Sequence, residues 1–269
     1  MKRAIDWERC NLFAPLGRAV IAGVHELGAV FLFFLKGMGL IASYPFQLKK
    51  FVEQTYFMGA KSMFIILLVA LFTGMVLGLQ LFYTLVKFGS EGVLGAAVAL
   101  SVIRELGPVL AAIMIVARAG SAMTAEIGIM RISEQIDALE TMDVNPIRYL
   151  ISPKMAAAVV SFPLLTALFD VTAIFGGYVS GVLLLKINSG IYFSRMTDMI
   201  TFQDISGGFY KSLAFGLIVV TICCYQGFYV HLRRAGFGAK GVSLATTSAV
   251  VLSCVLILIT DYVLTSFLL

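Results

Sequence analysis

The chain has 269 residues, of which 60% are hydrophobic and 13% are charged, and its formal net charge is +5. Its mean hydropathy is +0.97. Soluble domains carry about 25% charged residues, so this composition excludes a soluble globular protein and predicts an integral membrane protein. Lysine and arginine are scattered over the loops without a basic cluster, which argues against a nucleic-acid partner.

The first 56 residues are predicted to form an N-terminal cytoplasmic segment with an interfacial helix. The stretch 12–46 is apolar but is interrupted by Arg18, His25, Glu26 and Lys36. This mixture favours a helix in the membrane interface, or a re-entrant elbow, over a sixth crossing.

Five later segments each hold the roughly 20 apolar residues that a crossing needs. They are 57–86, 93–117, 150–185, 208–230 and 242–264. The third would reach about 54 Å as a straight helix, against a hydrocarbon core of about 30 Å. Pro153 and Pro163 are therefore expected to bend it or to mark an interfacial first part. We expect residues 57–269 to form one all-α membrane domain with five transmembrane helices.

The positions of lysine and arginine predict the orientation. Most lie at the N-terminus and in the linkers after the second and fourth crossings: Lys2, Arg3, Arg9, Arg118, Arg131, Arg148, Lys154, Arg233, Arg234 and Lys240. The other side has only Lys87, Lys186, Arg195 and Lys211. The N-terminus is then cytoplasmic and the C-terminus lies outside, where the segment 187–206 could form a short surface helix.

Arg104 and Glu105 are charges inside the second crossing. Counted from Val93, Arg104 lies about 16 Å along the helix, near mid-membrane. Ionised groups at that depth are costly and usually face a bundle interior or a wet cavity. Neighbours on a helix point about 100° apart, so each should find another partner. Pro108 removes a backbone hydrogen bond to residue 104 and can kink the helix. A cargo contact and a structural charge network both stay open.

Three further charged residues lie within or near the crossings. Lys211 and Asp261 are expected toward the outer ends of their helices. Lys211 either reaches the lipid headgroups or meets Glu105 or a lipid phosphate in a cavity. Asp170 lies inside the third crossing, with Arg104 as one candidate partner.

The linker 118–149 between the second and third crossings is polar and carries a partial apolar stripe at helical spacing. The stripe consists of Ile127, Met130, Ile136 and Leu139. An amphipathic cytoplasmic helix of this kind fits a groove on a partner protein, or it lies on the inner leaflet. Pro146 is expected to end it, because proline disfavours a helical residue before it.

Several motifs are absent. The sequence has no G-x-x-x-x-G-K-[ST] phosphate loop, no HExxH and no G-x-S-x-G elbow. Only two histidines are present, and the four cysteines lack metal-ligand or CxxC spacing, so they are interpreted as reduced packing residues. The cysteines are Cys10, Cys223, Cys224 and Cys254. We therefore expect no catalytic residue, no metal and no cofactor in this chain.

An ordered series of motifs resembles the MlaE-type permease family, the membrane subunit of lipid ABC transporters that work with MCE-domain proteins. The resemblance covers Gly59 to about Leu268. Its motifs are Gly74-Met75-Val76-Leu77-Gly78-Leu79-Gln80, Ala99-Leu100-Ser101, Arg104-Glu105-Leu106-Gly107-Pro108, Arg118-Ala119-Gly120-Ser121-Ala122, Thr124-Ala125-Glu126-Ile127-Gly128, Met130-Arg131, Glu134-Gln135, Asn145-Pro146, Ile151-Ser152-Pro153, Phe162-Pro163-Leu164-Leu165-Thr166 and Gly176-Gly177.

The resemblance implies a permease homodimer in the bacterial inner membrane, with two cytoplasmic ABC ATPase subunits that bind ATP and Mg²⁺. It also implies a periplasmic MCE-domain protein, expected to be hexameric, and in some members a STAS-domain subunit. The implied cargo is phospholipid, moved between the inner membrane and the MCE-domain protein in lipid trafficking that maintains outer-membrane asymmetry.

The same resemblance implies roles for individual residues. Arg104, Glu105 and Lys211 look like the polar residues of a lipid cavity, and Leu77, Phe88 and Leu106 look like its apolar lining. The family often has an aromatic hydroxyl where Phe88 stands. The segment of about 119–145 looks like a coupling helix for the ATPase, with these contact residues: Ala125, Glu126, Arg131, Glu134 and Asp137.

Two other functions stay open at this stage. The first is a secondary transporter that uses Asp170, Glu105 and Arg104 as an ion or proton relay, with Asp261 as a further member of an intramembrane charge network. The second is a membrane-bound lipid enzyme, which the missing catalytic motifs disfavour.

Overall fold

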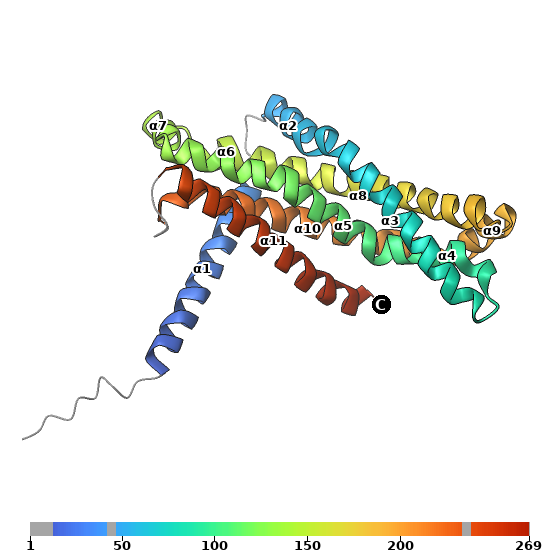
Figure 1. Cartoon of the computed structure of the whole chain (residues 1–269). Helices are drawn as coiled ribbons and strands as arrows, with labels where there is room; N and C mark the ends of the chain where they lie inside the picture. Colours follow the sequence, from blue (N-terminus) through green and yellow to red (C-terminus); the bar gives the residue numbers. More distant parts are fainter. Residues whose placement is uncertain (1–12, 42–46, 233–237, 269) are drawn as a thin grey trace, which may run out of the picture.

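The computed structural model describes residues 13–41, 47–232 and 238–268, and within these ranges every regular element is a helix (Figure 1). Predictions that concern Cys10 and five of the basic residues lie outside the described residues. Those basic residues are Lys2, Arg3, Arg9, Arg233 and Arg234.

The helices follow one another with short connections. The α-helices are α1 (Phe13–Gly39), α2 (Leu48–Thr55), α3 (Lys61–Val86), α4 (Leu94–Ser101), α5 (Gly107–Ile115), α6 (Ser121–Ile132), α7 (Gln135–Thr141), α8 (Ser152–Tyr178), α9 (Ser189–Met199), α10 (Phe202–Phe228) and α11 (Ala239–Leu268). Wider π-type turns join or extend several of them: η2 (Tyr56–Ala60), η4 (Val102–Leu106), η5 (Val116–Gly120), η6 (Ile147–Ile151) and η7 (Val179–Leu184). Short 3₁₀ turns are η3 (Glu91–Val93) and η8 (Val230–Leu232).

Six helical segments in the described ranges are long and apolar enough to cross a membrane. They are Val20–Gly39, Leu48–Val86, Glu91–Ile132, Ile147–Leu184, Phe202–Phe228 and Ala239–Leu268. The last five match the five predicted crossings, and α9 is the short helix predicted between the third and fourth. The count of five is not confirmed, because Val20–Gly39 in α1 also has the length and composition of a crossing.

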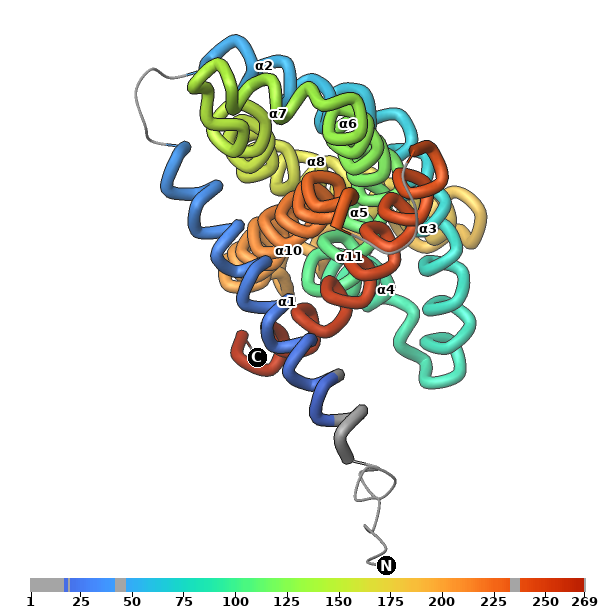
Figure 2. The backbone as a smooth tube through the Cα atoms, turned by 90° about the vertical axis from the view of Figure 1, so that its left-hand side faces the viewer, coloured from blue at the N-terminus to red at the C-terminus, as the bar shows by residue number. Residues whose placement is uncertain are grey.

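Helix α1 differs from the other long helices in how it packs. It is one continuous helix. Its C-terminal end lies against the bundle, and its axis is steeply inclined to the axes of the long bundle helices (Figures 1 and 2). Phe33, which is 2% exposed, attaches α1 to α10 through ring contacts with Tyr225 and Phe228 at 5.7 and 5.8 Å. Ser152 Oγ also donates a hydrogen bond to the carbonyl oxygen of Gly37 at 3.0 Å.

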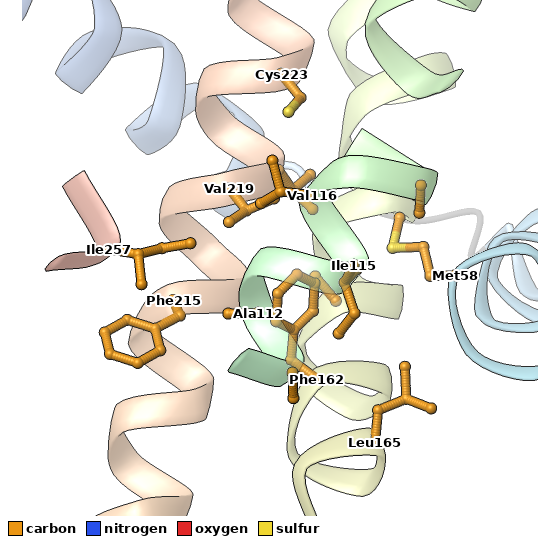
Figure 3. Close-up of a cluster of buried hydrophobic side chains, with 14 of the residues drawn as sticks. Met58, Ala112, Ile115, Val116, Phe162, Leu165, Phe215, Val219, Cys223 and Ile257 are labelled. Atoms are coloured by element: carbon orange, nitrogen blue, oxygen red, sulfur yellow. The ribbon is translucent and has the colours of Figure 1, made fainter. Parts of the chain in front are cut away.

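The core of the bundle lies between α5, α8 and α10. Phe162 of α8 and Phe215 of α10 are fully buried and pack with Ile115 of α5 in one apolar cluster (Figure 3). On the other side of α8, Gly74 of α3 lies so close to the backbone of Ala173 that a side chain there would collide with it. In a membrane, lipid covers apolar side chains as well as another helix does, so helices associate mainly through close packing. Small residues such as glycine allow that close packing.

Pro153 and Pro163 both lie within one continuous helical segment, Ile147–Leu184. Pro153 follows η6 in the first turn of α8, and Pro163 lies inside α8, which continues to Tyr178. Whether they bend the segment or mark an interfacial first part stays a prediction.

The predicted single helix over about 119–145 is wrong in extent. Helix α6 continues the long helix that starts at Glu91, and its buried residues Ile127 and Gly128 pack against α10 and α11. The helix breaks at Glu134, whose φ of 58° is left-handed and cannot continue a right-handed helix. Only α7, after this break, is a separate short helix.

Candidate functional site

Lys211 of α10 is the centre of a buried charge cluster. Its side chain is 3% exposed, and its Nζ lies 2.8 Å from Glu105 Oε2 and 3.0 Å from Asp261 Oδ1. Nζ also donates to Thr265 Oγ1 at 2.7 Å, and Thr265 in turn donates to Glu105 Oε1 at 3.1 Å. Lys211 therefore contacts Glu105 rather than reaching the headgroups, one of the two arrangements left open by the sequence.

The same ammonium group compensates for Pro108. Proline has no N–H, so the carbonyl of Arg104 loses its partner one turn along the helix. Lys211 Nζ donates to that carbonyl oxygen at 2.9 Å. An ammonium has three N–H donors, and Glu105, Thr265 and the carbonyl of Arg104 account for three of them.

Arg104 pairs with an acid that the sequence reading missed. Its Nε donates to Asp204 Oδ1 at 2.6 Å, across 100 positions of sequence. The other carboxylate oxygen of Asp204 accepts hydrogen bonds from the backbone N–H and the hydroxyl of Thr201, both at 2.8 Å. The Arg104 side chain is 42% exposed. Its Nη atoms make no hydrogen bond to the described residues.

These groups surround a pocket of about 330 Å³. The lining residues come from η4, the start of α10 and the end of α11: Arg104, Glu105, Thr201, Gln203, Asp204, Gly207, Gly208, Lys211, Thr265 and Leu268. Gly208 lets α10 approach η4, because a Cβ there would lie 2.7 Å from the carbonyl oxygen of Ile103. We call this the polar pocket.

Four predicted site residues lie away from the polar pocket. Leu77 and Leu106 are partly buried, and Phe88, in the turn after α3, is 78% exposed. Asp170 faces Gly107, and its Oδ1 is buried without a hydrogen-bond partner in the described part of the chain. Arg104, its candidate partner, binds Asp204 instead.

Asp204 and Thr265 are members of the site that the sequence reading did not select. Thr201 and Asp204 have the spacing of a helix N-terminal capping box. This spacing explains their contact with each other but does not indicate that Asp204 also pairs with Arg104. Thr265 lies four residues after Asp261, on the same helix face. This spacing from Asp261 could have identified Thr265 as a member of the site.

The opposite end of the bundle carries the predicted coupling residues. Glu126 pairs with the buried Lys154 at 2.8 Å and so joins α6 to α8. Arg131 pairs with Asp137 at 2.7 Å and joins α6 to α7. Ala125 is partly buried and Glu134 is exposed. Glu126, Arg131 and Asp137 therefore form ion pairs that join helices within this chain, whereas Glu134 is exposed.

His231 is a further contact of Arg131. Arg131 Nε donates to Nδ1 of His231 at 3.0 Å, which ties α6 to the end of α10. Burial, and next the neighbouring Arg131, lower the pKa of His231 below its ordinary value of 6.5. A neutral ring is what this hydrogen bond needs, because the ring nitrogen must accept it.

No group of three or more His, Cys, Asp or Glu side chains in the described ranges is placed to hold a metal ion. Cys223 and Cys224 are buried, and Cys254 is partly buried; all three are free thiols.

The chain is similar to permeases of ABC transporters over most of its length. The family model described as "Permease MlaE" matches residues 51–267. The "Intermembrane phospholipid transport system permease protein MlaE" of Haemophilus influenzae is 40% identical over 261 residues, covering 95% of this chain and 97% of that protein. A "Probable ABC transporter permease protein" of Rickettsia bellii is 38% identical over 255 residues, covering 95% and 96% of the two chains. A protein of Synechocystis sp. with the same description is 37% identical over 243 residues, covering 90% and 88%.

Proposed function

This chain belongs to the MlaE permease family, and from that premise we propose that it is the membrane subunit of an ATP-driven transporter of phospholipid. The polar pocket is the observation that carries this proposal. It holds Arg104 and Lys211 together with their acidic partners Asp204 and Glu105, at the ends of segments apolar enough to cross a membrane. The Nη donors of Arg104 are left for an anionic headgroup, and the neighbouring apolar helices suit acyl chains. The similarity to a phospholipid permease of Haemophilus influenzae supports the same cargo.

Within the pocket, we assign the phosphate contact to Arg104 rather than Lys211. The donors of Lys211 already bond to Glu105, Thr265 and the carbonyl of Arg104. Arg104 uses only Nε for Asp204, so its Nη donors can approach a phosphate in the fork geometry that guanidinium favours. Lys211 then holds the helices that shape the pocket.

The assembly that fits this role has two copies of the chain around a central cavity. Leu77, Phe88 and Leu106, which lie outside the pocket of one chain, are assigned to the apolar lining of that shared cavity. A periplasmic MCE-domain protein receives or supplies the lipid, and a STAS-domain subunit is a further partner in some systems. The chain is placed in the inner membrane with its N-terminus cytoplasmic and its C-terminus periplasmic, and α1 is assigned to the membrane interface because it runs across the bundle (Figure 2).

The force for transport is assigned to two cytoplasmic ATPase subunits that bind ATP and Mg²⁺. Helix α7 is the segment best suited to contact them, because it is short, separate and acidic. Glu134, Glu140 and Asp143 in and beside it are exposed. ATP can drive lipid movement only if ATP-bound subunits favour one state of the permease over another. This chain itself makes and breaks no covalent bond.

The rival function is a secondary transporter with Asp170, Glu105 and Arg104 as a relay. The contacts give it less support, because Arg104 and Glu105 bond to other partners and Asp170 faces Gly107.

One experiment separates the two functions. The permease is reconstituted in liposomes with its ATPase subunits, and movement of a labelled phospholipid is followed with ATP or with an ion gradient. Movement that requires ATP and persists after ionophore treatment supports the proposal. Movement driven by the gradient without nucleotide would replace it by the secondary transporter, and covalently altered lipid would indicate an enzyme.

A further inference from the structure

A second recess lies between α1 and α10, and its walls are almost wholly apolar. It has a volume of about 420 Å³ and lies between one face of α1, formed by Leu27, Val30 and Phe31, and residues 214–222 of α10. The one hydroxyl in its wall, that of Thr221, donates to the carbonyl of Leu217 in its own helix at 2.6 Å. The recess therefore leaves no side-chain polar group to satisfy. We call it the α1–α10 groove.

The groove is open on one side and lies beside the point where α1 is attached to α10. That attachment is the ring cluster in which Phe33 contacts Tyr225, Phe228 and Tyr229. The wall of α1 is open, since Leu27 is 69% and Phe31 is 60% exposed. This apolar wall is not covered by the rest of the described chain and is therefore accessible to a hydrocarbon chain.

The groove and the polar pocket lie on the same face of α10. Lys211, Ala214, Ile218 and Thr221 follow each other at intervals of three or four residues, which places them on one side of a helix. Lys211 lines the polar pocket, and the other three line the groove. From Lys211 to Ile222 the helix rises about 16 Å, so charge at one end of this face is followed by successive apolar turns.

We infer that the α1–α10 groove holds an acyl chain of the phospholipid whose phosphate lies at Arg104. The inference rests on the proposed function and adds a place for the tail. A charged pocket followed by an apolar groove along one helix face has the order of an amphiphile. Helix α1 then acts as a wall of the cargo path as well as an interfacial element.

The order of the two sites favours an acyl chain over a helix from a second copy. An apolar helix would match the groove alone, whereas a lipid with a charged head and an apolar tail matches both the polar pocket and the groove that follows it along α10. A single extended hydrocarbon chain is also thinner than a helix, which is about 10 Å across, and can follow the face of α10.

A photo-crosslinking experiment tests the inference. The complete permease–ATPase complex is placed in vesicles that contain phosphatidylethanolamine with a diazirine at the end of one acyl chain. After illumination, adducts are mapped by mass spectrometry. We expect adducts at residues 27–34 and 214–222 to exceed those near Val171, an α8 residue 69% exposed on the surface, by at least tenfold.

Two variants and one control sharpen the result. Ala214→Trp should fill the groove and lower its adducts about tenfold. Leu27→Trp should do the same from the exposed face of α1, where a larger side chain cannot disturb the core. Val171→Trp adds an equal bulk outside the groove and should leave the adducts unchanged.

The outcomes distinguish the groove from the proposed function. Equal labelling of the groove and the α8 surface would overturn the inference in favour of ordinary surrounding lipid. Crosslinks from the groove to a peptide of the second copy would overturn it in favour of a dimer contact. ATP-driven lipid movement without groove adducts would overturn the groove alone, whereas wild-type protein that moves no lipid with ATP would overturn the proposed function itself.

Discussion

The two ends of the bundle differ in how much of their acidic charge is paired. At the polar pocket, acids and bases far apart in sequence pair with each other, as Lys211 and Glu105 do across 106 positions. At the α7 end, the buried Lys154 pairs with Glu126 and Arg131 pairs with Asp137, but Glu134, Glu140 and Asp143 remain exposed. Buried pairs fix the positions of helices, because either partner alone would be an uncompensated charge. Exposed acids cost little and leave their charge available to a partner.

The largest expected effect comes from removing the centre of the polar pocket. Lys211→Met leaves Glu105 and Asp261 without their cation, and breaking a buried pair in this way costs about 3–5 kcal/mol. We expect a value near the lower limit, because Glu105 is 39% exposed. Denaturant titration of the purified chain measures the loss.

A triple variant is the control for this change. Lys211→Met with Glu105→Gln and Asp261→Asn removes all three charges and should regain most of the lost stability, since no charge is left unpaired. If the single variant were as stable as the wild type, the cluster would not hold the helices.

The second prediction concerns charge reversal at the exposed end. Glu140→Lys with Asp143→Lys should weaken binding of the ATPase subunits by roughly tenfold, because these substitutions reverse the charge presented to the partner. Copurification and a binding titration measure the effect. Glu126→Gln is the control at this end, since Glu126 is paired with Lys154 of the same chain and should affect association much less. If both variants weakened ATPase binding equally, the paired Glu126 would contact the ATPase as much as the exposed acids do, and the assignment of α7 as the contact would be wrong.

The smallest expected effect is a pH response at His231. Its pKa is lowered in the folded chain, so the folded state binds fewer protons and the neutral ring stabilises it above about pH 6.5. This stabilisation is lost as the pH falls below that value. Hydrogen exchange of the α7 amides, corrected for intrinsic rates, should show loosening on acidification. In His231→Gln the corrected exchange should no longer change with pH, and an unchanged pH response would assign it to another group.

The sequence predicted the spans better than the contacts. Mean hydropathy and the length of each apolar run located five of the six described segments that are long and apolar enough to cross a membrane, because a membrane requires this of any helix that spans it. The sequence did not determine whether α1 crosses the membrane. Its composition fits a crossing, but it is attached to the side of the bundle through Phe33. Packing of this kind depends on Tyr225 and Phe228, almost 200 positions away.

The candidate site was predicted in part for the same reason. The cost of an ionised group in a membrane selected Arg104, Glu105, Lys211 and Asp261 one by one. Their pairing could not be read, because the tertiary fold decides which helix ends meet. Asp204 was missed because its sequence position, in a polar segment expected outside the membrane, carries no sign of its pairing with Arg104.

The linker shows where local pattern misleads. Apolar residues at helical spacing suggested an amphipathic helix in the linker 118–149, and the family resemblance suggested a coupling helix over about 119–145. In the structure the stripe belongs partly to α6, which is buried against α10 and α11 because it continues a crossing helix. Glu134 adopts a left-handed backbone conformation, which the sequence does not indicate because glycine or asparagine usually occupies such a position.

The most direct test of the account is the amount of phospholipid moved for each ATP hydrolysed in reconstituted vesicles. Arg104→Ala removes the assigned phosphate contact, and hydrogen bonds to charged groups are worth about 1.5–3 kcal/mol, or roughly tenfold to hundredfold. We predict that this variant still binds its ATPase subunits and hydrolyses ATP but moves at least tenfold less lipid for each ATP. Arg104→Lys should lie between the two, because it keeps the charge without the fork. An unchanged yield of lipid per ATP in Arg104→Ala would contradict the assignment of the polar pocket to the cargo.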